Sequence, residues 1–196
     1  MSRISEDLQA FLAYAQLLDG DEKGESQVFC DRLFQAFGHA GYTFGILQSS
    51  LHWVWFQERC STLKSDPRYT SNTVFDSFPW PQAPSRAAAK AVAAAAVALR
   101  AKRRELCEKH NISLRKLYAS MEQPGNHPLK DATAALDTAV RKAYGMTPTA
   151  DPLKHLLALN LELAAAELDG KAITGPGLPP CVTDASAFVT EDAIKP

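Results

Sequence analysis

The chain has 196 residues, of which 46% are hydrophobic, and its 21 basic side chains nearly balance 22 acidic ones. This length supports one or two domains with a modest core, and the near-neutral balance excludes a uniformly basic nucleic-acid wrapper. No apolar run approaches the ~20 residues of a membrane span, and the residues after Met1 lack a signal-peptide core, so a cytoplasmic protein without a membrane partner is expected.

Two amphipathic helices are predicted within the first 40 residues. Ser5 suits the N-cap of the first helix, whose apolar side chains recur at helical spacing over residues 8–18. Residues 28–40 carry a second apolar stripe that ends among glycines. Two short helices cannot bury both stripes against each other alone, so they are interpreted as the opening of a larger domain.

The next segment mixes aromatic and β character. Residues 43–47 have the composition of a short strand. A buried helix is predicted over residues 51–56, because Leu51, Val54 and Trp55 share one side of it.

A polar turn and a second strand are predicted to follow. Residues 64–69 supply the turn, and the alternation over residues 73–78 is typical of an exposed edge strand. Pro79 and Pro81 end this strand, because proline cannot continue a hydrogen-bonded ladder.

The longest predicted helix lies in the most basic part of the chain. Residues 86–110 are rich in alanine and free of proline, and would extend ~37 Å if the helix is continuous. Val92, Leu99 and Leu106 recur every seven residues and predict a seam for a partner helix. Residues 83–116 hold nine basic and two acidic side chains, a net charge of +7 between acidic flanks.

Three further helices complete the prediction. One begins at Ser113, one covers residues 131–144, and the last opens with the N-cap and first-turn proline of Asp151–Pro152 and runs to Leu168. Residues 171–196 are interpreted as a disordered tail. The expected fold is therefore mainly α with a small β element (α+β), built from a helical N-terminal piece, a short aromatic β/α segment and a C-terminal helical bundle.

Three linked motifs in the middle segment resemble one known family. They are FGILQSSLHWVW at 44–55, LKSDPRY at 63–69 and NTVFDSFPWP at 72–81. This pattern resembles the late target-recognition segment of MmeI-like restriction–modification DNA methyltransferases, which are class I S-adenosylmethionine-dependent, adenine-specific methylases. Residues 114–118 and 135–145 are similar to the helical C-terminal domain of the same family.

The resemblance implies a division of the chain into segments. Residues 20–25 and 34–42 are similar to the family's extreme N-terminus, so the whole resemblance covers roughly residues 4–168. It implies the following segments: 1–42, a remnant of the N-terminal helices; 43–82, a partial target-recognition segment; 83–170, the helical C-terminal domain; and 171–196, the tail.

The motifs that would carry the family's chemistry are not found in this sequence. The methylase core needs an Asn/Asp-Pro-Pro-aromatic tetrapeptide to hold the extruded adenine, whereas Pro179–Pro180 follows a leucine and precedes a cysteine. No strand leading into a glycine-rich turn is available for S-adenosylmethionine. Asp21, Glu22 and Lys23 copy the letters of a Mg²⁺ nuclease site, but they fall in a predicted loop.

We therefore expect an internally truncated relative of the family. An in-frame deletion near Tyr42–Thr43 would join the N-terminal helices to the C-terminal third. No catalytic residue, cofactor site or metal site is assigned, and the chain is predicted to be inactive by itself as an adenine-N6 methyltransferase. Cys107 and His110 have the spacing of half a zinc site, but a structural cysteine beside an exposed histidine is favoured because no second ligand pair lies nearby.

Lys64 and Asp66 are the sharpest candidates for DNA recognition. Two residues apart on an extended chain, they would point the same way and could read one G·C pair, with lysine donating to guanine and aspartate accepting from cytosine. The resemblance supports this interpretation, because the family varies residues here with its target sequence. The alternative is an ordinary solvated turn before Pro67.

Two further sets of residues can each be interpreted either as DNA contacts or as ordinary structural residues. A polar set beside the turn can contact phosphates or bases, or can be a plain strand edge: Arg68, Tyr69, Ser71 and Asn72. An aromatic set can stack on bases, although a place in the core is favoured: Trp53, Trp55, Phe56, Phe78 and Trp80.

The basic helix and the residues after it suit a phosphate backbone. The candidates are Arg100, Lys102, Arg103, Arg104, Arg115 and Lys116. Their alternative is a solvated helix face, in which the pairs Glu105–Lys109 and Arg104–Glu108 offset part of the charge.

The expected partner is double-stranded DNA, bound weakly. The rival hypothesis is a helical interaction module that docks on a full-length methyltransferase or on a second copy of this chain, motivated by the seam of Val92, Leu99 and Leu106 and by the apolar stripes of the first 40 residues. A third is a non-functional gene remnant.

Overall fold

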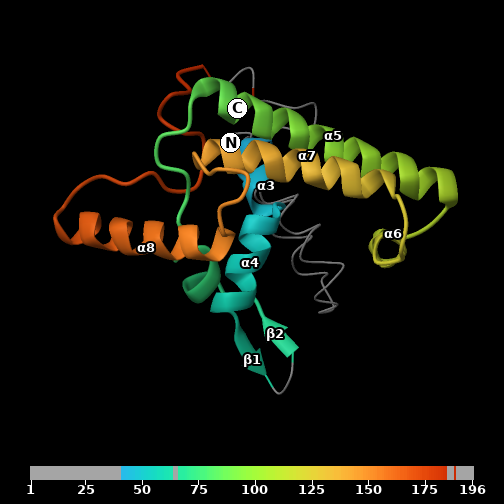
Figure 1. Ribbon diagram of the computed structural model, residues 1–196, viewed down its shortest axis with the longest axis horizontal. Helices are drawn as coiled ribbons and strands as arrows, with labels where there is room; N and C mark the ends of the chain where they lie inside the picture. The colour runs from blue at the N-terminus through green and yellow to red at the C-terminus, as the bar shows by residue number, and fades with distance from the viewer. Residues whose placement is uncertain (1–40, 64–65, 185–187, 189–196) are drawn as a thin grey trace, which may run out of the picture.

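The computed structural model describes residues 41–63, 66–184 and 188 (Figure 1). The two helices predicted in the first 40 residues, the Asp21–Lys23 stretch and Lys64 lie outside the described residues. The described part is mainly α with one small two-stranded sheet, which confirms the predicted fold class. Within it, no helix combines the length and the apolar character that crossing a membrane requires.

Two long helices form the centre of the molecule. Helix α5 (Arg86–His110) and helix α7 (Pro128–Ala143) lie side by side (Figure 1). The predicted seam of α5 is buried: Val92, Leu99 and Leu106 face inward. Its partner is therefore a helix of the same chain, and the seam is not a docking surface for another protein.

Helix α3 (Tyr42–Leu47) replaces the strand predicted at residues 43–47. Every residue of α3 is buried, and it packs closely on α5. A Cβ atom on Gly45 would lie 2.8 Å from Val92 Cγ1 and 3.1 Å from Ala96 Cβ. The small residues on both sides let the two helices approach, and this packing overrides the local strand preference of an aromatic and β-branched run.

Helix α4 (Ser50–Arg59) confirms the predicted buried helix, with Leu51 and Trp55 fully enclosed. Its first backbone N–H, that of Ser50, donates to Asp137 Oδ1 of α7 at 2.7 Å, which satisfies one of the donors that a helix start leaves open. The helix leads into a hairpin of β1 (Ser61–Leu63) and β2 (Asp66–Arg68).

The edge strand predicted over residues 73–78 is not formed. Residues Ser71–Phe75 make a single π-helical turn, η1, in which the Asp76 N–H donates to the Ser71 carbonyl at 2.8 Å. Val74 is fully buried here, and its carbonyl accepts the indole N–H of Trp55 at 3.2 Å. A buried contact with α4 thus decides the local backbone, which alternation alone could not show.

The remaining helices follow their local signals. Helix α6 covers Leu114–Met121, and α8 covers Pro152–Leu168 with the predicted cap, since Asp151 Oδ1 accepts the Lys154 N–H at 2.7 Å. Helix α7 starts earlier than predicted because His127 Nδ1 accepts the Leu129 N–H at 3.1 Å and so caps it.

The chain after α8 is an ordered coil over residues 171–184, although it was predicted to belong to a disordered tail. Gln82 and Thr174 share three hydrogen bonds of 2.8–3.1 Å that join the coil to the segment before α5. Leu178 and Val182 pack against the core. One continuous cluster of buried residues thus extends across the boundary predicted between residues 82 and 83.

Candidate nucleic-acid interface

The hairpin forms an arm at the end of α4. Figure 1 shows it extending from α4 away from the α5–α7 pair. Its antiparallel register pairs Ser61 with Arg68 and Leu63 with Asp66. Arg68 is exposed on this arm. The combined reading of a base pair by Lys64 and Asp66 stays a prediction, because Lys64 lies outside the described residues.

The polar candidates after β2 gather at the foot of this arm. Ser71 and Asn72, the first two residues of η1, are exposed and follow Tyr69 after Thr70. The Tyr69 side chain is 44% exposed, and its hydroxyl lies 3.3 Å from His52 Nε2. Together with the Arg68 guanidinium, these hydroxyl and amide groups form one exposed edge. We call Arg68, Tyr69, Ser71 and Asn72 the recognition edge.

The aromatic candidates separate into a buried and an exposed group. Trp55, Phe78 and Trp80 are buried in the core, as favoured from the sequence, and Phe56 is partly buried. Trp53 departs from that prediction, because its side chain is 57% exposed. Two positions along a helix correspond to a rotation of ~200°, so Trp53 and Trp55 cannot both face the same core.

His52 is a buried residue that contacts Tyr69 of the recognition edge. It is 8% exposed and contacts Phe78 edge-to-face, with ring centroids 4.9 Å apart. Burial lowers the pKa of His52 from 6.5 to about 4, although a hydrogen bond to the Leu47 backbone acts in the opposite direction. The ring is therefore neutral at neutral pH and offers a fixed partner to the Tyr69 hydroxyl. Sequence reasoning missed this residue, because a histidine beside tryptophans carries no local signal of its role.

The buried histidine predicts a pH-dependent stability. The unfolded chain protonates His52 near pH 6.5, whereas the folded chain resists protonation until about pH 4. The contribution of neutral His52 is complete above pH 6.5 and declines as pH falls through this window. From pH 7 to pH 5, the free energy of unfolding measured by urea titration should fall in both proteins. The fall should be about 2 kcal/mol smaller in His52→Gln than in the unmodified chain. His110→Gln, at an exposed site, serves as the control, and equal losses in all three proteins would contradict the prediction.

Arg103 is a correction to the predicted phosphate contacts. Its side chain is only 8% exposed. The Nη2 group donates to Gln48 Oε1 at 2.6 Å, and the guanidinium lies 5.4 Å from the ring centroid of Tyr118. Arg103 thus joins α5 to the α3–α4 turn and to α6. The sequence alone does not indicate this burial, because the residues that contact Arg103 come from other elements.

The other basic candidates occupy the second half of α5 and the start of α6. Arg104, Arg115 and Lys116 are exposed. Arg100 is partly buried, with its guanidinium 6.0 Å from the ring centroid of Phe44. In Figure 1, α6 and the hairpin lie apart, so the structure does not bring the basic residues of α6 beside the recognition edge.

Acidic neighbours modify the charge of α5. Lys102 Nζ lies 2.6 Å from Glu105 Oε2, and this hydrogen bond lowers the pKa of the Glu105 carboxyl. Glu105 therefore pairs with Lys102 instead of forming the predicted bridge to Lys109, whose charge adds a smaller effect. Lys102 is consequently a poorer phosphate ligand than the exposed arginines.

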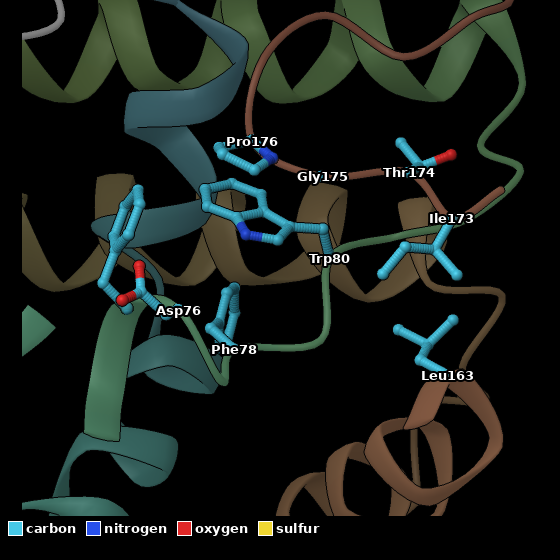
Figure 2. A pocket seen from close by; sticks show the side chains of 9 residues that line it. Asp76, Phe78, Trp80, Leu163, Ile173, Thr174, Gly175 and Pro176 are labelled. Carbon is cyan, nitrogen blue, oxygen red and sulfur yellow. The ribbon is translucent and has the colours of Figure 1, made fainter. Parts of the chain in front are cut away.

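Neither a metal centre nor a phosphate cradle emerges from the described residues. Cys107 is partly buried against the core, His110 is exposed, and no group of three or more metal-ligating side chains occurs in the described part of the chain. A cavity of about 220 Å³ lies between η1, α8 and the coil, with Trp80, Leu163 and Ile173 in its lining (Figure 2). Asp76 is the charged residue in the lining of this cavity, and the lining contains no lysine or arginine. The cavity therefore does not suit a phosphate.

Comparisons with known proteins point to the same segment. Residues 22–82 match the family model described as "MmeI, target recognition domain". A solved structure described as Type IIL restriction-modification enzyme MmeI in complex with DNA is 30% identical, with a TM-score of 0.53 over 62% of this chain. This chain spans 16% of that protein. No curated protein matches.

Residues 22–82 are therefore similar to a target-recognition segment of a restriction–modification enzyme. More particularly, the segment is MmeI-like. The matched range contains the hairpin and the whole recognition edge, whereas the basic residues of α5 and α6 lie outside it. The deletion predicted near Tyr42–Thr43 falls inside the matched range and stays a prediction.

Proposed function

We propose that this chain binds double-stranded DNA as a sequence-recognition module, with the hairpin and the recognition edge as its contact surface. The observation that carries the proposal is the exposed Arg68 on β2, followed directly by exposed hydrogen-bonding groups inside the MmeI-like segment. An arginine can neutralise a phosphate or donate two hydrogen bonds to guanine, and hydroxyl and amide groups serve either purpose.

Two sets of residues extend this surface in the proposal. Lys64 and Asp66 would read a G·C pair from the hairpin. Arg104, Arg115 and Lys116 would add sequence-independent phosphate contacts along flanking DNA. The similarity to MmeI supports a DNA partner, because that protein was solved in complex with DNA and shares 30% identity with this chain. The proposal concerns recognition alone and assigns no methyl transfer or cleavage to the described residues.

Arg68→Ala tests the contact surface. Loss of one phosphate or guanine contact should weaken binding of labelled duplex DNA and, if the contact is to phosphate, reduce the slope of log affinity against log salt by about 1. Fluorescence anisotropy across a salt series measures both quantities. Arg86→Ala removes another exposed arginine, at the N-terminal end of α5 and outside the proposed surface, and should change neither. A chain that binds no duplex even at low salt would overturn the proposal.

A second candidate function is docking on a full-length restriction–modification protein or on a second copy of this chain. Helix α8 favours it, because Leu161 is 71% exposed and Leu168 is 90% exposed. The seam of α5 no longer supports this candidate, since its residues are buried within this chain. Light scattering during size exclusion, alone and after mixing with an MmeI-type enzyme, distinguishes a monomer from either complex.

A further inference from the structure

Three aromatic rings form a connected surface beside the hairpin. Trp53 and Phe56 lie on α4 with ring centroids 5.2 Å apart, and Phe56 stacks on Tyr69 at 5.7 Å. The two outer members are solvent-exposed, Trp53 at 57% and Tyr69 at 44%. We call these three residues the aromatic edge. Their exposure in water is costly, so a flat partner that covers them would be stabilised.

The Tyr69 end of the aromatic edge is held against the core by a buried histidine. Tyr69 contacts the buried His52 through its ring, 5.8 Å between centroids, and through its hydroxyl. His52 in turn contacts Phe78, which packs edge-to-face on Trp80 at 5.3 Å. A ring surface held in this way loses little conformational freedom on binding, which favours stacking on a planar ligand.

The charges around the aromatic edge fit a phosphate-bearing partner. Arg68 precedes Tyr69 in the chain and is exposed. Arg59, also exposed, lies on α4 with its guanidinium 5.5 Å from the Trp55 ring centroid. Glu58, next to Arg59 in the chain, is an exposed acidic residue of α4.

We propose that Trp53 is a base-stacking residue, which binds the face of a DNA base that is unpaired or displaced from the helix. Paired bases inside a duplex present only their edges, so an indole ring needs an exposed base to stack upon. Arg68, next to Tyr69 in the chain, would hold an adjoining phosphate. This inference rests on the proposed DNA-binding function and adds to it a preference for DNA with a locally unpaired base.

The test compares two labelled duplexes of the same sequence, one fully paired and one with a single-base bulge. The unmodified chain should bind the bulged duplex more tightly. Trp53→Ala should weaken that binding ~5- to ~100-fold, the range for loss of one stacking residue, and abolish the preference. Trp53→Phe keeps an aromatic face and should retain most of it. Val97→Ala on α5 removes an exposed apolar side chain outside the proposed surfaces and should leave both affinities unchanged.

Tryptophan fluorescence gives a direct readout of the same contact. The chain has three tryptophans, and Trp55 and Trp80 are buried, so acrylamide should quench mainly Trp53. Bulged DNA should protect this emission in the unmodified chain, and Trp53→Phe should show no protected component. Circular dichroism of each variant verifies that the fold is intact.

The possible outcomes separate the two proposals. If Arg68→Ala weakens binding while Trp53→Ala behaves like Val97→Ala, the stacking role is wrong and the DNA-binding function stands. If Trp53→Ala weakens binding to the two duplexes equally, Trp53 contacts the backbone or a groove. That result would also overturn the stacking role. Absence of binding to either duplex at low salt would remove the DNA-binding function and the inference together.

Discussion

Leu99→Ala should lower the free energy of unfolding by about 2–5 kcal/mol, the largest effect expected of any single change proposed for this chain. Leu99 is 1% exposed at the middle of the α5 seam, between Val92 and Leu106. Truncation removes three buried carbon atoms and leaves a cavity that the flanking helices cannot fill without moving. Urea unfolding followed by circular dichroism measures the loss.

Val97→Ala is the matched control for this prediction. Val97 lies two positions away on the same helix and is 43% exposed, so its truncation opens no enclosed cavity. Alanine also has the higher helix propensity, and the control should stay within about 0.5 kcal/mol of the unmodified chain. Similar losses in the two variants would mean that the seam does not carry the packing described for it.

Gly45→Ala should destabilise the chain by about 1–3 kcal/mol, although alanine is the better helix former by about 1 kcal/mol. The new Cβ atom would lie 2.8 Å from Val92 Cγ1 and 3.2 Å from the Val92 carbonyl oxygen. Val92 is β-branched and fully buried, so neither its rotamer nor the α5 backbone can yield freely. Helix α3 must therefore shift away from α5.

Gly175→Ala separates this close approach from a general effect of replacing glycine. A Cβ on Gly175 would meet no atom within 4 Å, and the backbone there has no positive φ. Thermal and urea unfolding should leave this variant near the unmodified chain or slightly above it. A stabilised Gly45→Ala protein would contradict the α3–α5 packing, and with it the position of the recognition segment on the central helices.

The elements predicted correctly are those whose signals lie in neighbouring residues. Asp151 and Pro152 begin α8, as predicted, because a side-chain cap and a proline act within the first helical turn. The α5 helix was predicted at 86–110 with its seam, and the structure forms it over Arg86–His110. A proline-free alanine-rich stretch and a seven-residue repeat are local properties, so no other part of the chain is needed to recognise them.

The elements predicted wrongly depend on contacts between segments far apart in the chain. Residues 43–47 have strand-forming composition but become α3, because Gly45 lets them reach Val92 and Ala96. The alternating run at 73–78 becomes the η1 turn, because Trp55 fixes the carbonyl of Val74. In both cases a partner from another helix outweighs the local preference.

The candidate interface divides along the same line. The sequence by itself determined the residue types of the recognition edge and their place beside a turn, because residue type and order are local properties of the chain. Only the tertiary structure decided exposure: Arg103 is enclosed by Gln48 and Tyr118, while Trp53 is left in water. The physical reason is that a side chain's accessibility depends on which elements arrive from elsewhere to cover it.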